Sequence, residues 1–203
     1  MTVLTTHGTP ILIVPPLVLP AGLGRYRRSD YEALPDRQAC ELLLGRIYGR
    51  PRPSVAHETV LDSAWRQLQA IAAATGGRAY RGPVEIALAD HSVVKPDVFF
   101  LSAGQRDLVV ARAGGAPDLV VEVLSPATVR QDRREKLILY ARCGVKEYWL
   151  LDPEPRLAEF LVNEGGSFVP TLPDARGHRS PTIAGLTLDL AALWRALEEA
   201  LRP

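Results

Sequence analysis

The stretch of residues 117–152 restricts the possible folds more than any other part of this sequence. It contains two short apolar runs, 119–124 and 148–151, separated by a Ser-Pro turn and a helix-like segment with Lys136 near its middle. Short apolar runs bounded by turn residues are typical of buried strands. The pattern therefore predicts two parallel strands joined by a helical, right-handed crossover connection.

The rest of the chain also mixes strand and helix patterns. Further expected strands are 39–44, 46–50, 84–88, 93–101, 157–163, 167–172 and 187–190. Further expected helices are 29–34, capped by Ser29 or Asp30, 55–74, capped by Ser54, and 191–201, capped by Asp189. Pro96 cannot donate a hydrogen bond to a neighbouring strand, so it predicts an edge, bend or bulge. This order predicts a mixed α/β (α+β) fold with a central sheet and a helix on each face.

Length and composition predict one globular domain. The 203 residues are 47% hydrophobic and 23% charged, which suits a single core. We expect the domain to cover residues 29–203, after a Pro-rich arm over residues 1–28, with a surface loop at 102–116. The apolar stretch 11–23 is broken by prolines and is too short to cross a bilayer, so we expect an extended arm and no membrane segment.

The net charge limits the possible binding partners, and the cysteine content indicates the cellular compartment. A formal net charge of +1 argues against binding of nucleic acid by bulk charge, so any such binding needs a local basic patch. Cys40 and Cys143 are far apart and the four histidines are scattered, which predicts neither a disulfide framework nor a zinc site. Reduced thiols predict a cytoplasmic protein.

Asp97 and Glu122 are carboxylates placed within apolar strand segments. Valines flank Glu122 on both sides, and Asp97 follows Pro96. A buried carboxylate is unfavourable unless it is paired, hydrogen-bonded or bound to a cation. Two carboxylates on adjacent strands repel one another unless a divalent ion lies between them. Oxygen ligands of this kind suit Mg²⁺ or Mn²⁺, which can activate water for the hydrolysis of a phosphodiester.

Lys136 supplies a cation near the expected carboxylate pair. It is one of three lysines in the chain and lies beside the apolar face of its helix, so its flexible stem can carry the ammonium toward the pair. Each residue also has a structural interpretation: Asp97 as a turn or edge residue, Glu122 as half of an ion pair with an arginine, and Lys136 as a solvated helix lysine. Their occurrence together, in this order, favours a functional site.

The sequence resembles the Uma2 family, a branch of the PD-(D/E)XK nuclease superfamily with the restriction-endonuclease-like fold. The resemblance is carried by Pro96-Asp97, PDLVVEVLSPAT (117–128), Asp132 with Glu135-Lys136-Leu137 and Tyr140, and GVKEYWLLDP (144–153). The segment CELLLGRIY (40–48) and the region around His57 match more loosely. The resemblance spans about residues 29–190 and implies a mixed central sheet flanked by helices.

The resemblance also implies roles for individual residues. Asp97 and Glu122 would be metal ligands, with the backbone carbonyl of Val123 as a further one. The superfamily pattern places a lysine two residues after the glutamate, where this chain has Leu124. In this branch the lysine comes from the following helix, which points to Lys136.

Two further residues each have two possible roles. Glu41 matches a family acid and either joins the metal site or is structural, since its strand also carries apolar core residues. His57 either touches substrate or is an ordinary helix residue.

Together these features predict a Mg²⁺- or Mn²⁺-dependent endonuclease that acts on DNA. The expected catalytic residues are Asp97, Glu122, Lys136 and Glu41, and the expected phosphate contacts are Arg130, Arg133 and Arg134. Nucleases of this superfamily often dimerise to cut both strands, so a homodimer is expected, with the Pro-rich arm and the late strands as candidate contacts. Two alternatives stay open: a non-catalytic nucleic-acid-binding or protein-binding domain, and a structural pairing of the acids with buried arginines.

Overall fold

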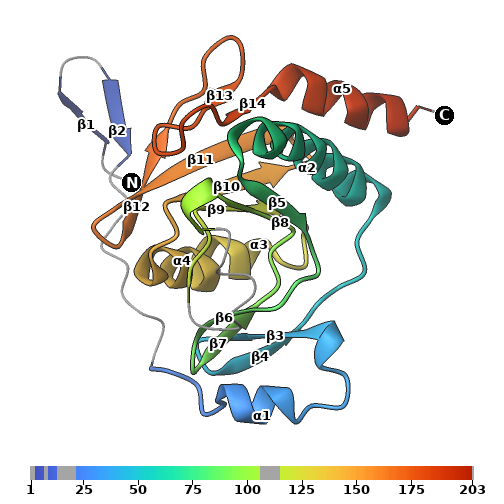
Figure 1. Cartoon of the computed structure of the whole chain (residues 1–203), viewed down its shortest axis with the longest axis vertical. Helices are drawn as coiled ribbons and strands as arrows, with labels where there is room; N and C mark the ends of the chain where they lie inside the picture. The colour runs from blue at the N-terminus through green and yellow to red at the C-terminus, as the bar shows by residue number, and fades with distance from the viewer. Residues whose placement is uncertain (1–2, 7–8, 13–21, 106–114, 203) are drawn as a thin grey trace.

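The structure of the chain, a computed structural model, describes residues 3–6, 9–12, 22–105 and 115–202 (Figure 1). Its largest element is a six-stranded sheet. In spatial order the strands are β12 (Ser167–Thr171), β11 (Leu157–Glu164), β10 (Glu147–Asp152), β9 (Leu119–Val123), β8 (Val98–Leu101) and β5 (Arg78–Arg81). The expected arm over 11–23 and the expected loop over 102–116 lie largely outside the described residues.

The two central strands, β9 and β10, are parallel, as the sequence predicts, and the other neighbours in this sheet are antiparallel. A helical segment joins β9 to β10. It consists of α3 (Val129–Gln131), a π-helical turn (Asp132–Lys136) and α4 (Leu137–Cys143). We refer to residues 132–136 as the π turn. The sequence pattern predicts the crossover helix but not this wide turn within it.

The side chains of β9 alternate between two cores, one on each face of the sheet. The odd-numbered residues pack with α2 (Val55–Thr75) and α5 (Leu190–Ala200). On the opposite face, Val120 and Leu124 pack with α4. Helices therefore cover both faces, which confirms the expected mixed architecture. Because Glu122 is even-numbered, its side chain lies on the α4 face, among buried residues.

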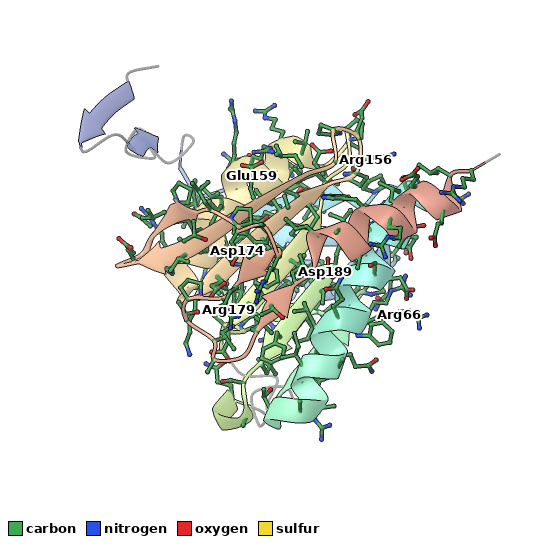
Figure 2. All side chains as sticks on the ribbon, turned by 90° about the horizontal axis from the view of Figure 1, so that it is seen from above. Arg66, Arg156, Glu159, Asp174, Arg179 and Asp189 are labelled. Carbon is green, nitrogen blue, oxygen red and sulfur yellow. The ribbon has the colours of Figure 1, made fainter. Side chains whose placement is uncertain are left out.

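The helices α2 and α5 pack against each other on one face (Figure 2). The Asp189 N–H donates to Gln67 Oε1 at 2.8 Å, and Gln67 Nε2 donates to the Asp189 carbonyl at 3.2 Å. Asp189 also caps α5, because its side chain accepts from the Ala192 N–H at 2.9 Å. Ser54 caps α2 in the same way by accepting from the His57 N–H at 3.2 Å. Both caps are those predicted from the sequence.

A second, four-stranded sheet packs below the large one in Figure 1, next to α1 (Arg28–Glu32). Its strands, in order, are β4 (Arg46–Gly49), β3 (Cys40–Leu43), β7 (Ser92–Val94) and β6 (Ile86–Ala89). Leu44 and Gly45 form the β3–β4 turn with φ values of 50° and 78°, a conformation that glycine adopts without strain. Two further hairpins pair β1 (Val3–Thr6) with β2 (Thr9–Leu12), and β13 (His178–Arg179) with β14 (Thr187–Leu188).

The predicted strand over 93–101 is in fact two strands that belong to different sheets. Ser92–Val94 forms β7 of the small sheet and Val98–Leu101 forms β8 of the large sheet. The break falls at Lys95-Pro96-Asp97, where proline has no N–H to donate to a ladder. This junction connects the two sheets and places Asp97 between them.

Three smaller differences concern element ends and short strands. The N-cap of α1 is Arg27 instead of Ser29 or Asp30, and the Asp30 side chain accepts from the Arg27 N–H at 2.8 Å. The strands β5 and β13 were not expected, because their sequences are short and lack apolar alternation.

No helix in the described part of the chain is both long and apolar enough to cross a membrane.

Candidate active site

A cleft of about 580 Å³ lies where the two sheets, the first turn of α2 and the π turn meet. Four buried acids line it, and we call Glu41, Asp97, Glu122 and Asp132 the acid cluster. The exposed fractions of these residues lie between 1% and 7%. Lys136, which is 4% exposed, also lines the cleft. Buried carboxylates such as these need ion pairs, hydrogen bonds or a bound cation, since an unpaired buried carboxylate is costly.

Asp97 immediately precedes β8, which pairs antiparallel with β9, the strand that contains Glu122. The register pairs Val98 with Val121, so the next position places Asp97 opposite Glu122. Asp97 Oδ2 accepts from the Val123 N–H at 2.8 Å, which connects the carboxylate to the C-terminal end of β9. The structure thus brings together the two carboxylates that the sequence singles out.

Two basic side chains approach Asp97 from other elements. His57 Nε2 on α2 lies 3.3 Å from Asp97 Oδ2, and Arg50 Nη2, after β4, lies 3.8 Å from Asp97 Oδ1. Burial alone would lower the pKa of His57, but the Asp97 carboxylate outweighs it and leaves that pKa above its usual value. In turn, burial would raise the pKa of Asp97, but His57, Lys136 and the Val123 N–H hold it below its usual value. Asp97 is therefore ionised at neutral pH.

Lys136 is enclosed by three members of the acid cluster. Its Nζ lies 2.9 Å from Glu122 Oε1, 3.2 Å from Glu41 Oε2 and 3.2 Å from Asp132 Oδ1. This geometry agrees with the expectation that the ammonium points into the site instead of into solvent. The three carboxylates outweigh burial and raise the pKa of Lys136 well above its usual value, so the side chain stays charged.

Glu122 is held in a definite orientation. Besides Lys136, the Tyr140 hydroxyl donates to Glu122 Oε1 at 2.8 Å. Burial, reinforced by Asp97, Asp132 and Glu41, raises the pKa of Glu122 well above its usual value, although Lys136 opposes the shift. Within 3.3 Å, the four carboxyl groups of the cluster meet two basic side chains, Lys136 and His57, so carboxyl groups are in excess of their close basic partners. A further cation would relieve that excess.

The π turn places Asp132 and Lys136 on the same side of the helix. The Tyr148 hydroxyl of β10 donates to the Asp132 carbonyl at the start of this turn, at 3.1 Å. Insertions of this kind into helices are frequent at functional sites. Asp132 itself was not among the predicted site residues. Two sequence signals could have identified it, namely its place among the residues that carry the family resemblance and its position four residues before Lys136.

Glu41 joins the cluster through an unexpected contact with Lys95. The Lys95 N–H donates to Glu41 Oε1, which leaves Glu41 Oε2 to face Lys136. The Lys95 ammonium is fully buried and donates to the carbonyls of Arg37, Gln38 and Cys40. Lys95 therefore fixes both the Glu41 carboxylate and the segment that precedes Glu41. This arrangement places Glu41 beside the other acids but does not by itself assign it a catalytic role.

The three helix arginines predicted to contact phosphate do not line the cleft, and their role stays a prediction. Both terminal nitrogens of Arg133 donate to Glu159, which Figure 2 labels on β11. The arginines that do line the cleft are Arg50, Arg52 and Arg81. Sequence reasoning missed them, although the Arg-Pro-Arg-Pro run before α2 was a visible signal.

The donor set of the cleft fits a hard divalent ion. Among the described residues no three His, Cys, Asp or Glu side chains are grouped so as to hold a metal by themselves. Mg²⁺ does not need such a group, because it takes one or two protein carboxylates and keeps several waters. Asp97 and Glu122, with the Val123 carbonyl, could supply oxygen ligands of that kind, and a cation would compensate the excess of carboxyl groups in the cluster.

Comparisons with known proteins agree with this geometry. The model of the Uma2 family, described as “Putative restriction endonuclease”, matches residues 28–191. A solved structure, described as “a putative nuclease belonging to DUF820” from Anabaena variabilis ATCC 29413, superposes with a TM-score of 0.69. It shares 18% sequence identity, over 84% of this chain and 98% of that one, and so supports the fold. No curated protein matches the chain.

Proposed function

Because the chain belongs to the Uma2 family, we propose that it is a Mg²⁺- or Mn²⁺-dependent endonuclease that hydrolyses phosphodiester bonds in DNA. The observation that carries this proposal is the acid cluster, in which Asp97 and Glu122 face each other across two strands and Lys136 reaches Glu122 at 2.9 Å. Buried carboxylates arranged with a lysine in an open cleft suit hydrolysis of a phosphate ester better than they suit a purely structural core.

The residues of the cleft have separable tasks in this proposal. Asp97 and Glu122, with the Val123 carbonyl, would hold the divalent ion, and Glu41 is a further candidate ligand. When bound, such an ion supplies a Lewis acid that activates water and offsets charge on the phosphate. Lys136 neutralises charge that develops during hydrolysis. Tyr140 keeps Glu122 oriented through its hydrogen bond.

Nicking of a supercoiled plasmid in the presence of Mg²⁺ or Mn²⁺ tests the proposal. We expect the wild type to nick and Asp97→Asn to lose most of that activity, because the amide cannot supply the same charge to the ion. Glu198→Gln, on the exposed end of α5, is the matched control and should nick like the wild type.

Two results would contradict the proposal. One is equal activity of the wild type and Asp97→Asn, which would point to a contaminating nuclease. The other is salt-sensitive binding of DNA by the wild type without cleavage under any metal condition, which would favour the non-catalytic binding domain.

A further inference from the structure

The segment of residues 50–54, which joins β4 to α2, forms one rim of the cleft. Its sequence is Arg-Pro-Arg-Pro-Ser. Pro51 and Pro53 fix their own φ angles and restrict the residues that precede them. The Arg50 N–H also donates to the Ala39 carbonyl at 2.7 Å. The backbone that carries Arg50 and Arg52 is therefore constrained, whereas both side chains border the open cleft.

Neither arginine of this segment is held by a close acidic partner. The Arg50 Nη2 to Asp97 Oδ1 distance of 3.8 Å exceeds that of a hydrogen bond. Arg52 is exposed, and within the described part of the chain it makes no ion pair or hydrogen bond. By contrast, Arg81 is paired with Glu58, and Arg133 is paired with Glu159. Arg50 and Arg52 therefore keep most of their donors available to a ligand.

The charges of the cleft are arranged in two layers. The acid cluster and Lys136 form a buried floor, while Arg50 is partly exposed and Arg52 is exposed at the rim. An anionic strand that approaches the floor meets a group of buried carboxyl groups, and cations at the rim would offset the repulsion from those that are ionised. The planar guanidinium matches phosphate oxygens through paired N–H donors, which a lysine cannot reproduce.

We propose, resting on the nuclease function above, that Arg50 and Arg52 form the subsite that holds a phosphate of the DNA strand beside the bond to be cleaved. Arg50 exchanges its long contact with Asp97 for the phosphate when DNA binds, and Arg52 contacts the same backbone from the outer rim. The Pro-containing segment 50–54 is already constrained, which lowers the backbone ordering cost when both guanidinium groups bind the phosphate.

Fluorescence anisotropy of a labelled DNA duplex, titrated with protein at several NaCl concentrations, tests this subsite. Ca²⁺ replaces Mg²⁺ in these titrations, and a gel verifies that the DNA stays intact. We expect Arg50→Gln and Arg52→Gln each to reduce the salt slope of the association constant by about 0.9, which corresponds to roughly an eightfold loss of affinity at 0.1 M salt. Arg52→Lys should keep the slope, because it keeps the charge.

Arg142→Gln is the matched control, since this exposed arginine lies in the last turn of α4, away from the residues that line the cleft. It should bind DNA like the wild type. Unchanged affinity and slope in both Arg50→Gln and Arg52→Gln would overturn the subsite. So would losses confined to Arg130→Gln, Arg133→Gln and Arg134→Gln.

Different experimental results would contradict the proposed subsite and the proposed nuclease function. A wild type that nicks plasmid with Mg²⁺, while Arg52→Gln and Arg50→Gln bind DNA equally well, contradicts only the subsite. A wild type whose DNA binding depends on Arg52 but which never nicks contradicts only the nuclease function. A wild type that binds no DNA overturns the subsite together with the nuclease proposal.

Discussion

Lys136 is the cation around which the acid cluster is built. Its Nζ contacts Glu122, Glu41 and Asp132 within 3.2 Å, and its side chain is almost completely buried. Removing one partner from a buried charged group leaves the others uncompensated. A divalent ion bound by Glu122 would share a carboxylate with Lys136. The lysine is therefore expected to weaken metal binding at the same time as it supports the chemistry.

We expect Lys136→Met to bind Mn²⁺ more tightly than the wild type, by at least about tenfold, and to lose nicking activity. The physical reason is that two unit charges about 4 Å apart interact by about 4 kcal/mol at an effective dielectric constant of 20. Isothermal titration calorimetry measures the affinity, and Arg142→Met, on an exposed arginine of α4, is the control. Equal or weaker Mn²⁺ binding by folded Lys136→Met would show that the lysine does not compete with the ion.

Glu147 is another buried acid, and both oxygens of its carboxylate accept hydrogen bonds. Its carboxylate accepts from the hydroxyls of Ser180 and Thr182, from the Thr182 N–H at 3.1 Å and from Trp149 Nε1 at 2.9 Å. Burial alone would raise the pKa of Glu147, but His178 and these donors outweigh it and lower the pKa to about 2. The site ties the start of β10 to the segment after β13.

Glu147 should stabilise the fold in a pH-dependent way. Its pKa falls from 4.5 in the unfolded chain to about 2 in the folded chain, so the stabilisation is complete above pH 4.5 and is lost as the pH falls toward 2. The shift corresponds to roughly 3 kcal/mol. Urea unfolding of Glu147→Gln and the wild type should therefore give stabilities that differ most near pH 7 and converge in acid. A difference that stays constant with pH would refute this assignment.

At the scale of elements, the π turn decides whether Asp132 and Lys136 reach the cleft. Tyr148 on β10 donates to the Asp132 carbonyl and so couples the turn to the central sheet. The Lys95-Pro96-Asp97 junction has a similar effect at the other side of the site. It ends one strand, begins another, and orients Glu41 through the Lys95 N–H.

We expect Tyr148→Phe to destabilise the protein by about 1 kcal/mol, because the buried Asp132 carbonyl loses the hydrogen bond from the Tyr148 hydroxyl. Nicking should slow in kcat with little change in KM, since Lys136 is displaced but the rim that binds DNA is intact. Urea denaturation and steady-state kinetics measure the two effects. Tyr80→Phe, on a half-buried tyrosine stacked on Phe99, is the control. Wild-type stability of Tyr148→Phe would mean that the hydrogen bond does not maintain the turn.

At the scale of the whole molecule, β12 is an outermost strand of the six-stranded sheet in the part of the chain that the structure describes. Val169 within it is 39% exposed, and Leu172 just after it is 84% exposed. An edge strand with unpaired backbone groups and exposed apolar side chains favours association with another copy. Cleavage of both DNA strands also requires two sites, which a homodimer supplies.

We therefore expect a dimer in sedimentation velocity experiments, and we expect Leu172→Lys to shift it toward monomer. The substitution places a charge on an exposed apolar position and should leave the fold unchanged. Leu201→Lys, at the exposed end of α5, is the matched control. A wild type that stays monomeric at all concentrations would contradict the dimer, and a Leu172→Lys variant that stays dimeric would place the contact elsewhere.

The local sequence pattern determined most of the elements and the identity of the central acids. Periodicity and capping residues predicted α2 and α5, because helices depend on neighbours within a few positions, and the strand–helix–strand order predicted the parallel pair β9–β10. An acid inside an apolar strand identified Glu122, and Pro96 marked a break before Asp97. The resemblance to the Uma2 family then indicated Lys136 as the lysine of the site, in place of the position that Leu124 occupies.

Only the tertiary structure decided which charges meet. Asp132, Glu41 and Lys136 come together because of a π turn and a backbone contact from Lys95, and neither leaves a periodic signal in the sequence. The expected phosphate contacts on the crossover helix do not line the cleft, whereas Arg50 and Arg52 do. Side-chain direction at such positions depends on elements far apart in the chain, and local propensity carries no information about their packing.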